Sequence, residues 1–164
     1  MKGAWDPVAG RPWLLAALGI VVADQLTKWI VVQRFALFET LTLLPVLDLT
    51  RLHNTGAAFS LFADQAGWQR WFFTLVALGV AVVLVVVLLR LAQGYDRWLA
   101  ACLALVLGGA LGNVIDRIRF GYVIDFVHLH WDRWYWPAFN VADSAISIGA
   151  VLLLLDAFRR PKKG

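Results

Sequence analysis

Two uninterrupted apolar runs constrain the fold of this chain more than any other feature of its sequence. Trp71–Leu89 and Trp98–Ile115 contain no charged residue, and each approaches the ~20 residues that an α-helix needs to cross a bilayer. Hydrophobic residues make up 61% of the 164 residues and charged residues 16%, whereas about a quarter of a water-soluble domain is charged. We therefore predict a membrane protein, with membrane lipids among its partners.

Two further apolar runs carry charges. Trp13–Val32 contains Asp24 and Lys28, and Val141–Phe158 contains an aspartate near each end. We interpret both runs as membrane spans. A cleaved signal peptide is the alternative for the first run, but its apolar pattern continues past Lys28 and no small-residue cleavage site precedes a polar mature sequence.

Four spans define the predicted fold class, an all-α membrane protein built as a four-transmembrane-helix bundle. Both termini then lie on one side, and the basic residues are densest in the short segments of that side, which places the termini in the cytoplasm. The long connections, residues 33–70 and 116–138, face outward. Glu39–Asn54 alternates polar residues with leucines around Pro45, which predicts a small antiparallel β-sheet on the outer surface of the membrane.

Charge and cysteine content argue against two other classes of protein, nucleic-acid-binding and disulfide-stabilised. The net charge of +4 does not indicate a nucleic-acid partner, because the basic residues lie between the apolar runs rather than in one stripe. The single cysteine, Cys102, excludes an internal disulfide. We find no repeat or linker, and we expect one domain over residues 1–164 and a monomer.

Ionisable side chains at membrane depth are costly and usually functional. Asp24 and Lys28 are four residues apart with the acid first, so they share a helix face and can pair. A local ion pair that only orients the helix explains them about as well as a functional role. Asn113, Asp116 and Arg117 likewise share one face at the end of the third span.

The fourth span carries a similar polar stripe. It is formed by Asn140, Asp143, Ser144 and Ser147. The polar residues of three helices are therefore expected at one depth near the outer face. Gly108 and Gly112 have the spacing that lets membrane helices approach closely, although this pattern alone more often reflects packing.

The residue types exclude several chemistries. The sequence has no Cys/His cluster with zinc spacing, no serine in a Ser-x-x-Lys or G-x-S-x-G context and no glycine-rich phosphate loop. His128 and His130 would share one face of a strand, but two histidines are a weak metal site. No metal or cofactor is predicted.

Carboxylates remain as the reactive groups. Two carboxylates in a low-dielectric site share a proton, so one can act as general base on water while the other donates a proton to the leaving group. Spacing alone leaves several pairs open among Asp24, Asp116, Asp125 and Asp143.

Four motifs give a more specific indication. They are ADQLTKWIV (Ala23–Val31), HNTGAAFS (His53–Ser60), GNVIDRIRFGYVIDF (Gly112–Phe126) and FNVADSAISIG (Phe139–Gly149). Together they resemble the bacterial lipoprotein signal peptidases, also called type II signal peptidases. The resemblance follows the family's order of motifs and covers almost the whole chain.

The resemblance implies an aspartyl protease of the bacterial inner membrane. Its substrate would be a prolipoprotein with a diacylglyceryl cysteine, and cleavage before that cysteine would release the signal peptide. Asp125 and Asp143 would be the catalytic pair, and no cofactor would be needed. Asn113 and Arg117 would hold the substrate backbone.

The resemblance also implies a set of supporting residues. Asn54 and Gly56 would contribute from the outer sheet, and Asn140 would lie beside the two aspartates. Asp24 and Lys28 would brace the site from the first helix. The supporting role of Asp116 would be to pair with Arg117 or with Lys28.

Two other functions fit parts of the pattern. A small transporter could use the intramembrane charges as a relay, but the inner halves of the second and third spans carry no polar groups for a pathway. A non-catalytic assembly protein could use its polar stripes to hold helices together, and it would tolerate isosteric Asp→Asn changes.

Overall fold

The computed structural model describes residues 9–56, 68–91 and 96–159. Both ends of the chain and the last four residues of the HNTGAAFS motif lie outside this description.

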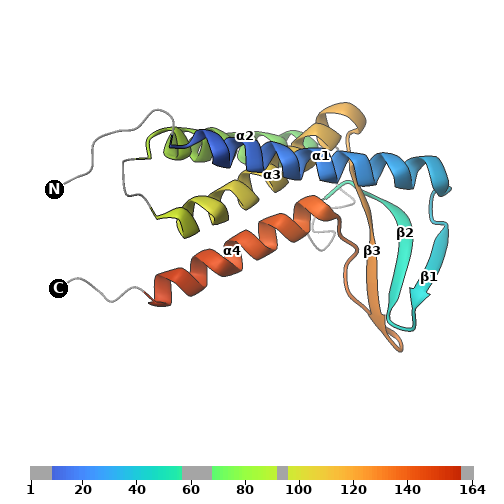
Figure 1. The fold of residues 1–164 in the computed structure, drawn as a ribbon. Helices are drawn as coiled ribbons and strands as arrows, with labels where there is room; N and C mark the ends of the chain where they lie inside the picture. Colours follow the sequence, from blue (N-terminus) through green and yellow to red (C-terminus); the bar gives the residue numbers. More distant parts are fainter. Residues whose placement is uncertain (1–8, 57–67, 92–95, 160–164) are drawn as a thin grey trace.

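Four long helices form the body of the protein. They are α1 (Arg11–Arg34), α2 (Trp68–Leu89), α3 (Arg97–Phe120) and α4 (Val141–Arg159). Each has the length and apolar composition needed to cross a membrane, so the predicted four-span fold is confirmed. The start of α1 and the end of α4 lie at the same end of the molecule, and the sheet lies at the opposite end (Figure 1).

The end of α3 differs from the predicted boundary. The helix continues past Ile115 to Phe120, where Gly121 takes a left-handed conformation (φ 87°) and its N–H bonds to the carbonyl of Arg117. The predicted boundary at Ile115 is therefore wrong, whereas the predicted helix that carries Asn113, Asp116 and Arg117 on one face is confirmed. Asp116 and Arg117 are helical, because the cap that ends the helix comes later than the first charges.

The sheet is antiparallel, as predicted, and has four strands in the order β1-β2-β3-β4. The strands are β1 (Thr40–Leu44), β2 (Leu47–Asn54), β3 (Val123–Trp131) and β4 (Trp134–Tyr135). The expected turn at Pro45 joins β1 to β2, with Leu44 paired to Leu47. β3 was not predicted as a strand of this sheet; it pairs with β2 and brings Asp125 opposite Leu52.

α3 is the central helix. In the most apolar 18-residue stretch of α3, 56% of the residues are buried, against 17–22% in the corresponding stretches of the other three helices. Small residues permit this close packing: a Cβ on Gly108 would lie 2.7 Å from the carbonyl of Ala17, and one on Gly112 would lie 2.6 Å from a carboxylate oxygen of Asp24. Larger side chains at these positions would push α1 away from α3.

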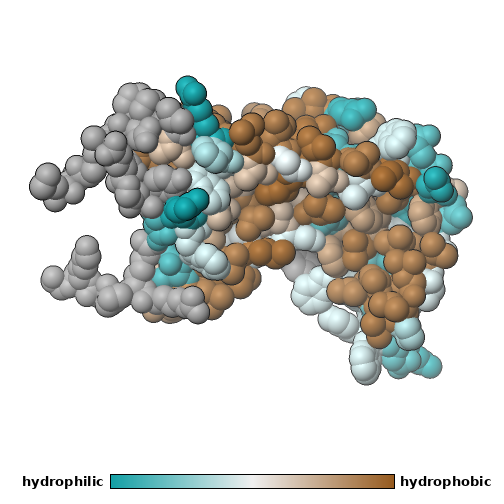
Figure 2. Space-filling model, in the orientation of Figure 1, coloured by the Kyte–Doolittle hydropathy of each residue, from teal (hydrophilic) through white to brown (hydrophobic). Residues whose placement is uncertain are grey.

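The surface has the polarity expected of a protein dissolved in lipid. Large apolar side chains such as Leu75, Val82 and Leu154 are more than half exposed on the helices, and Figure 2 shows apolar residues over much of the helical body. In contrast, Asp24 and Lys28 are buried at 0% and 2% exposure. The polar groups that lipid would penalise are thus gathered inside the bundle.

Candidate active site

Lys28 is the centre of a buried charge cluster that joins α1 to α3. Its Nζ lies 2.8 Å from Oδ2 of Asp24 and 2.9 Å from Oδ2 of Asp116. It also donates a hydrogen bond to Oδ1 of Asn113 at 3.1 Å. The pair Asp24–Lys28 is therefore more than a local contact within one helix. Of the two partners considered for Asp116, the structure has Lys28 and gives no ion pair with Arg117 among the described residues.

The same cluster reaches the backbone next to two other aspartates. Oδ1 of Asp24 accepts a hydrogen bond at 2.9 Å from the N–H of Ala142, which precedes Asp143. Oδ2 of Asp116 accepts one at 3.1 Å from the N–H of Ile124, which precedes Asp125. Each buried carboxylate of the cluster thus fixes the backbone immediately before one of these aspartates.

Gln25 belongs to the cluster but was missed as a site residue. Its Nε2 donates to Oδ1 of Asp116 at 2.8 Å and to the carbonyl of Gly112 at 3.2 Å. Neighbouring residues on a helix do not share a face, so the position of Gln25 next to Asp24 did not indicate that it belongs to the site. The length of the glutamine side chain lets its amide reach the same cluster.

Asp125 is held on β3 by two amides. It is 2% exposed, and Oδ1 accepts a hydrogen bond from Asn140 at 2.7 Å while Oδ2 accepts one from Asn54 at 3.0 Å. Burial raises the pKa of Asp125 to about 7, the negative charge of Asp143 adds to the increase, and the two amide hydrogen bonds oppose it. Asp125 can therefore exchange a proton near neutral pH, as an acid–base catalyst must.

Asp143 lies at the start of α4 and is linked to Asp125 through asparagines. Oδ1 of Asp143 accepts from Asn113 at 2.8 Å, and its N–H donates to Oδ1 of Asn140 at 2.8 Å. Asn140, which is fully buried, also donates to Asn113 at 3.2 Å. The second carboxylate oxygen of Asp143 has no hydrogen-bond partner among the described residues.

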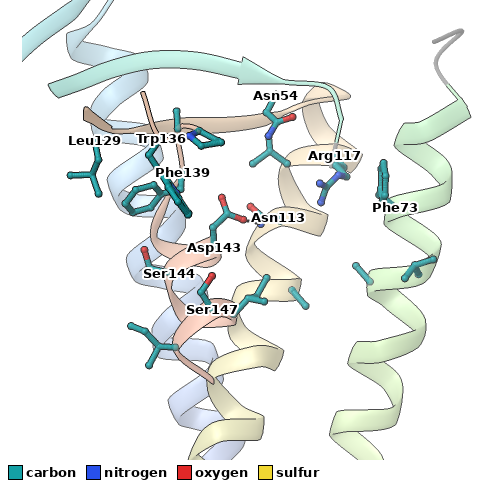
Figure 3. Close-up of a pocket in the computed structure, with 18 residues that line it drawn as sticks. Asn54, Phe73, Asn113, Arg117, Leu129, Trp136, Phe139, Asp143, Ser144 and Ser147 are labelled. Atoms are coloured by element: carbon teal, nitrogen blue, oxygen red, sulfur yellow. Dashed lines mark hydrogen bonds between the residues drawn. The ribbon is translucent and has the colours of Figure 1, made fainter. Parts of the chain in front are cut away.

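A cavity of about 650 Å³ opens beside Asp143. Its walls come from α2, α3, α4, the strands β2 and β3 and the segment before α4, and they are formed by Asn54, Phe73, Val76, Ala77, Ala110, Asn113, Arg117, Val123, Leu129, Trp136, Pro137, Ala138, Phe139, Asp143, Ser144, Ile146, Ser147 and Ile148. Figure 3 shows Asp143 and Asn113 close together on α4 and α3, with Asn54 beyond them at the sheet. Asp125 does not line this cavity, so of the two aspartates Asp143 is the one in contact with it.

Arg117 connects the cavity to the end of β2. Its Nη2 lies 3.4 Å from the carbonyl of Gly56, which accepts the hydrogen bond, and its guanidinium lies 5.8 Å from the ring centroid of Phe73. The N–H of Gly56 in turn donates to Oδ1 of Asn54 at 3.0 Å. With these contacts, all ten residues singled out from the sequence are joined into one network.

The histidines of β3 lie elsewhere on the sheet. Nε2 of His130 is 3.3 Å from Oδ2 of Asp48, and the rings of His128 and His130 lie 5.0 and 5.2 Å from that of Tyr135. Among the described residues, no group of three or more His, Cys, Asp or Glu side chains is placed to hold a metal ion.

The fold and the site together define a class of protein: a membrane protein of four spanning helices with a network of carboxylates and amides where the bundle meets a small sheet. The family follows from comparison with known proteins. A family model described as signal peptidase (SPase) II matches residues 16–159. The chain belongs to this family, and it is a bacterial membrane protease, a hydrolase.

Individual relatives agree along nearly the whole chain. A lipoprotein signal peptidase of Pseudomonas aeruginosa (strain UCBPP-PA14) is 52% identical over 161 residues, which cover 97% of this chain and 95% of that protein. One from Pseudomonas fluorescens (strain Pf0-1) is 53% identical over 154 residues, covering 93% and 90%. A bacterial membrane enzyme solved by the in meso method at 2.3 Å has a TM-score of 0.79 and 30% identity, covering 100% of this chain and 98% of that one.

Proposed function

We propose that the protein is an intramembrane aspartyl endopeptidase that removes the signal peptide from diacylglyceryl-modified prolipoproteins by cutting before the lipidated cysteine. The substrate class comes from the relatives, which are lipoprotein signal peptidases. The observation that carries the mechanism is the linkage of Asp125 and Asp143 through Asn140, with one carboxyl buried and the other on a cavity wall.

The two aspartates would share one proton at neutral pH. Burial raises the pKa of Asp125 to about 7, so this carboxyl can hold the shared proton near neutral pH. Asp143 lines the cavity with a carboxylate oxygen that has no partner among the described residues, so it would take the proton from the attacking water. The water oxygen then adds to the scissile carbonyl, and the proton held by Asp125 passes to the leaving amine as the peptide bond breaks.

The remaining network residues would position the substrate and the two aspartates. Asn113 and Arg117 line the cavity and can hydrogen-bond to the substrate backbone. Asn54 and Gly56 would support them from β2, since Gly56 contacts both Asn54 and Arg117.

The buried charge cluster would brace the catalytic pair. Asp24 and Asp116 fix the backbone directly before Asp143 and Asp125, and Lys28 forms an ion pair with each of the two carboxylates. Such outer contacts hold reacting groups in the productive geometry. The cluster would therefore act through the two aspartates rather than on the substrate.

We place the protein in the inner membrane with both termini in the cytoplasm, because the basic residues are densest in the short segments at the terminal end. The sheet and the active site then lie near the outer face, where the cleavage point of a membrane-inserted prolipoprotein meets water. A monomer that needs neither metal nor organic cofactor stays a prediction. The transporter and assembly-protein alternatives have no support in a chain of this family.

The test uses purified protein in lipid and a prolipoprotein that carries a diacylglyceryl cysteine. We expect mass spectrometry to find cleavage directly before the modified cysteine. Asp125→Asn and Asp143→Asn should each abolish cleavage while the thermal unfolding transition is retained. Asp132→Asn, an exposed aspartate beyond β3 with a positive φ of 53°, is the matched control, because asparagine tolerates that conformation. Near-normal turnover of either active-site variant would refute the mechanism.

A further inference from the structure

Ser147 differs from the other hydroxyl side chains of the four described helices. Thr27, Thr74 and Ser144 each donate to the carbonyl four residues earlier in their own helix, at 2.8, 2.6 and 2.9 Å. Ser147 is exposed and has no hydrogen-bond partner among the described residues. A hydroxyl without a partner in apolar surroundings costs free energy.

The side chain of Ser147 faces the cavity beside Asp143. It lines the cavity beside Asp143 and lies one helical turn from it, about 6 Å farther from the sheet. Figure 3 shows the two side chains on the same side of α4, which faces α3. The cavity walls around Ser147 are apolar and include Val76, Ala77 and Ala110. A ligand in the cavity can therefore supply the hydrogen-bond partner that the protein does not.

A polypeptide backbone offers such a partner only where it is unwound. Inside a helix the carbonyls already accept hydrogen bonds, whereas a protease must bind the chain around the scissile bond in an open form. An irregular backbone at membrane depth needs partners from the protein that surrounds it. In the proposed orientation Ser147 lies deeper in the membrane than Asp143, and the signal peptide occupies this deeper part. An unwound stretch on the signal-peptide side of the scissile bond would therefore pass Ser147.

We propose that the hydroxyl of Ser147 donates a hydrogen bond to a backbone carbonyl of the substrate on the signal-peptide side of the scissile bond. This subsite rests on the proposed function, because it assumes that a signal peptide occupies the cavity. The bond is made one turn away from the reacting atoms, so it contributes to substrate binding and not to the chemical step.

Two variants of equal shape isolate the hydroxyl. Ser147→Val and Ser147→Thr add similar bulk, but only threonine keeps the donor. We expect Ser147→Val to raise KM roughly three- to tenfold with little change in kcat, as for the loss of one neutral hydrogen bond. Ser147→Thr should stay within about twofold of the wild type. Equal KM values for the two variants would overturn the proposal.

Ser147→Ala, which adds no bulk, covers the case in which both larger side chains impair the enzyme. An unchanged KM for this variant would also overturn the proposal. Cleavage by the wild-type protein in the same assay reports on the proposed function, so its failure is distinguished from failure of the subsite.

The ester carbonyls of the diacylglyceryl group are the other possible acceptors. A prolipoprotein with ether-linked chains lacks them and keeps the peptide backbone. The increase in KM for Ser147→Val should persist with this substrate. If it occurs only with the diester, the acceptor is the lipid and the proposal is wrong.

Discussion

Asparagine in place of Asp125 should change how the stability of the protein depends on pH. In the folded protein the carboxyl holds its proton up to about pH 7, whereas its ordinary pKa is 3.8. A raised pKa contributes stability that is complete below the unfolded pKa and is lost as the pH rises through the folded one. Asp125 should therefore make the folded protein more stable in acid than at alkaline pH.

The size of this effect follows from the two pKa values. Between pH 5 and pH 8 the unfolded carboxyl is largely ionised, whereas the folded one is protonated at pH 5 and half ionised near pH 7. Stability therefore falls by at most about 1.4 kcal/mol per pH unit, or about 2.5 kcal/mol over the whole interval. For a chain of this size, that corresponds to a shift of the unfolding temperature of roughly 5–10 °C. Asp125→Asn removes this contribution because asparagine does not titrate.

The measurement compares the unfolding temperatures of wild type and Asp125→Asn at pH 5 and pH 8, followed by the fluorescence of the nine tryptophans. Asparagine also turns an amide donor toward Asn54 or Asn140, which costs about 1–3 kcal/mol. This cost is the same at both pH values and cancels in the comparison. Asp132→Asn serves as the control: it keeps Asp125, so its unfolding temperature should fall from pH 5 to pH 8 by as much as that of the wild type. An equal difference between wild type and Asp125→Asn at both pH values would refute the reasoning.

Three further predictions concern the same network. Lys28→Met should lower the free energy of unfolding by about 3–5 kcal/mol, because it leaves two buried carboxylates without their cation; denaturant titration in detergent measures it, and an unchanged midpoint would contradict it. Gly112→Ala should destabilise by about 1–3 kcal/mol, since its Cβ would lie 2.6 Å from a buried carboxylate oxygen, whereas Gly19→Ala, with no atom within 4 Å, should be neutral in the same titration. Asn54→Ala removes a hydrogen bond that lowers the pKa of Asp125, so the limb of the pH–kcat/KM profile governed by Asp125 should move to higher pH; a limb that stays in place or moves to lower pH would contradict this assignment.

The four spans could be read from the sequence because they depend on local composition. A run of about 20 apolar residues is stable in a bilayer as a helix whatever surrounds it. The pairing of Asp24 with Lys28 was equally accessible, since residues four apart share a helix face. The β1–β2 hairpin followed from the alternating pattern around Pro45.

Elements whose apolar pattern is interrupted by charged or polar residues were harder to predict. The end of α3 was placed at Ile115 because charges normally mark the point where a helix leaves the membrane. These charges are instead paired or bonded inside the bundle, and Gly121 ends the helix later. β3 was missed although Val123–Trp131 is rich in β-branched and aromatic residues, because Asp125 and two histidines interrupt the pattern.

The sequence by itself determined that the chain spans a membrane, and its motifs singled out the residues of the network. It left Asp116 and Asp125 as equal candidates when spacing alone was considered. Tertiary structure gives them different surroundings: Asp116 is paired with Lys28, whereas Asp125 is buried between two neutral amides and has a raised pKa. The ionisation of a buried carboxyl depends on the groups within a few ångströms of it. For Asp125 those groups are Asn54 at the end of β2 and Asn140 just before α4, 71 and 15 residues away in the sequence, and only the folded chain brings them together.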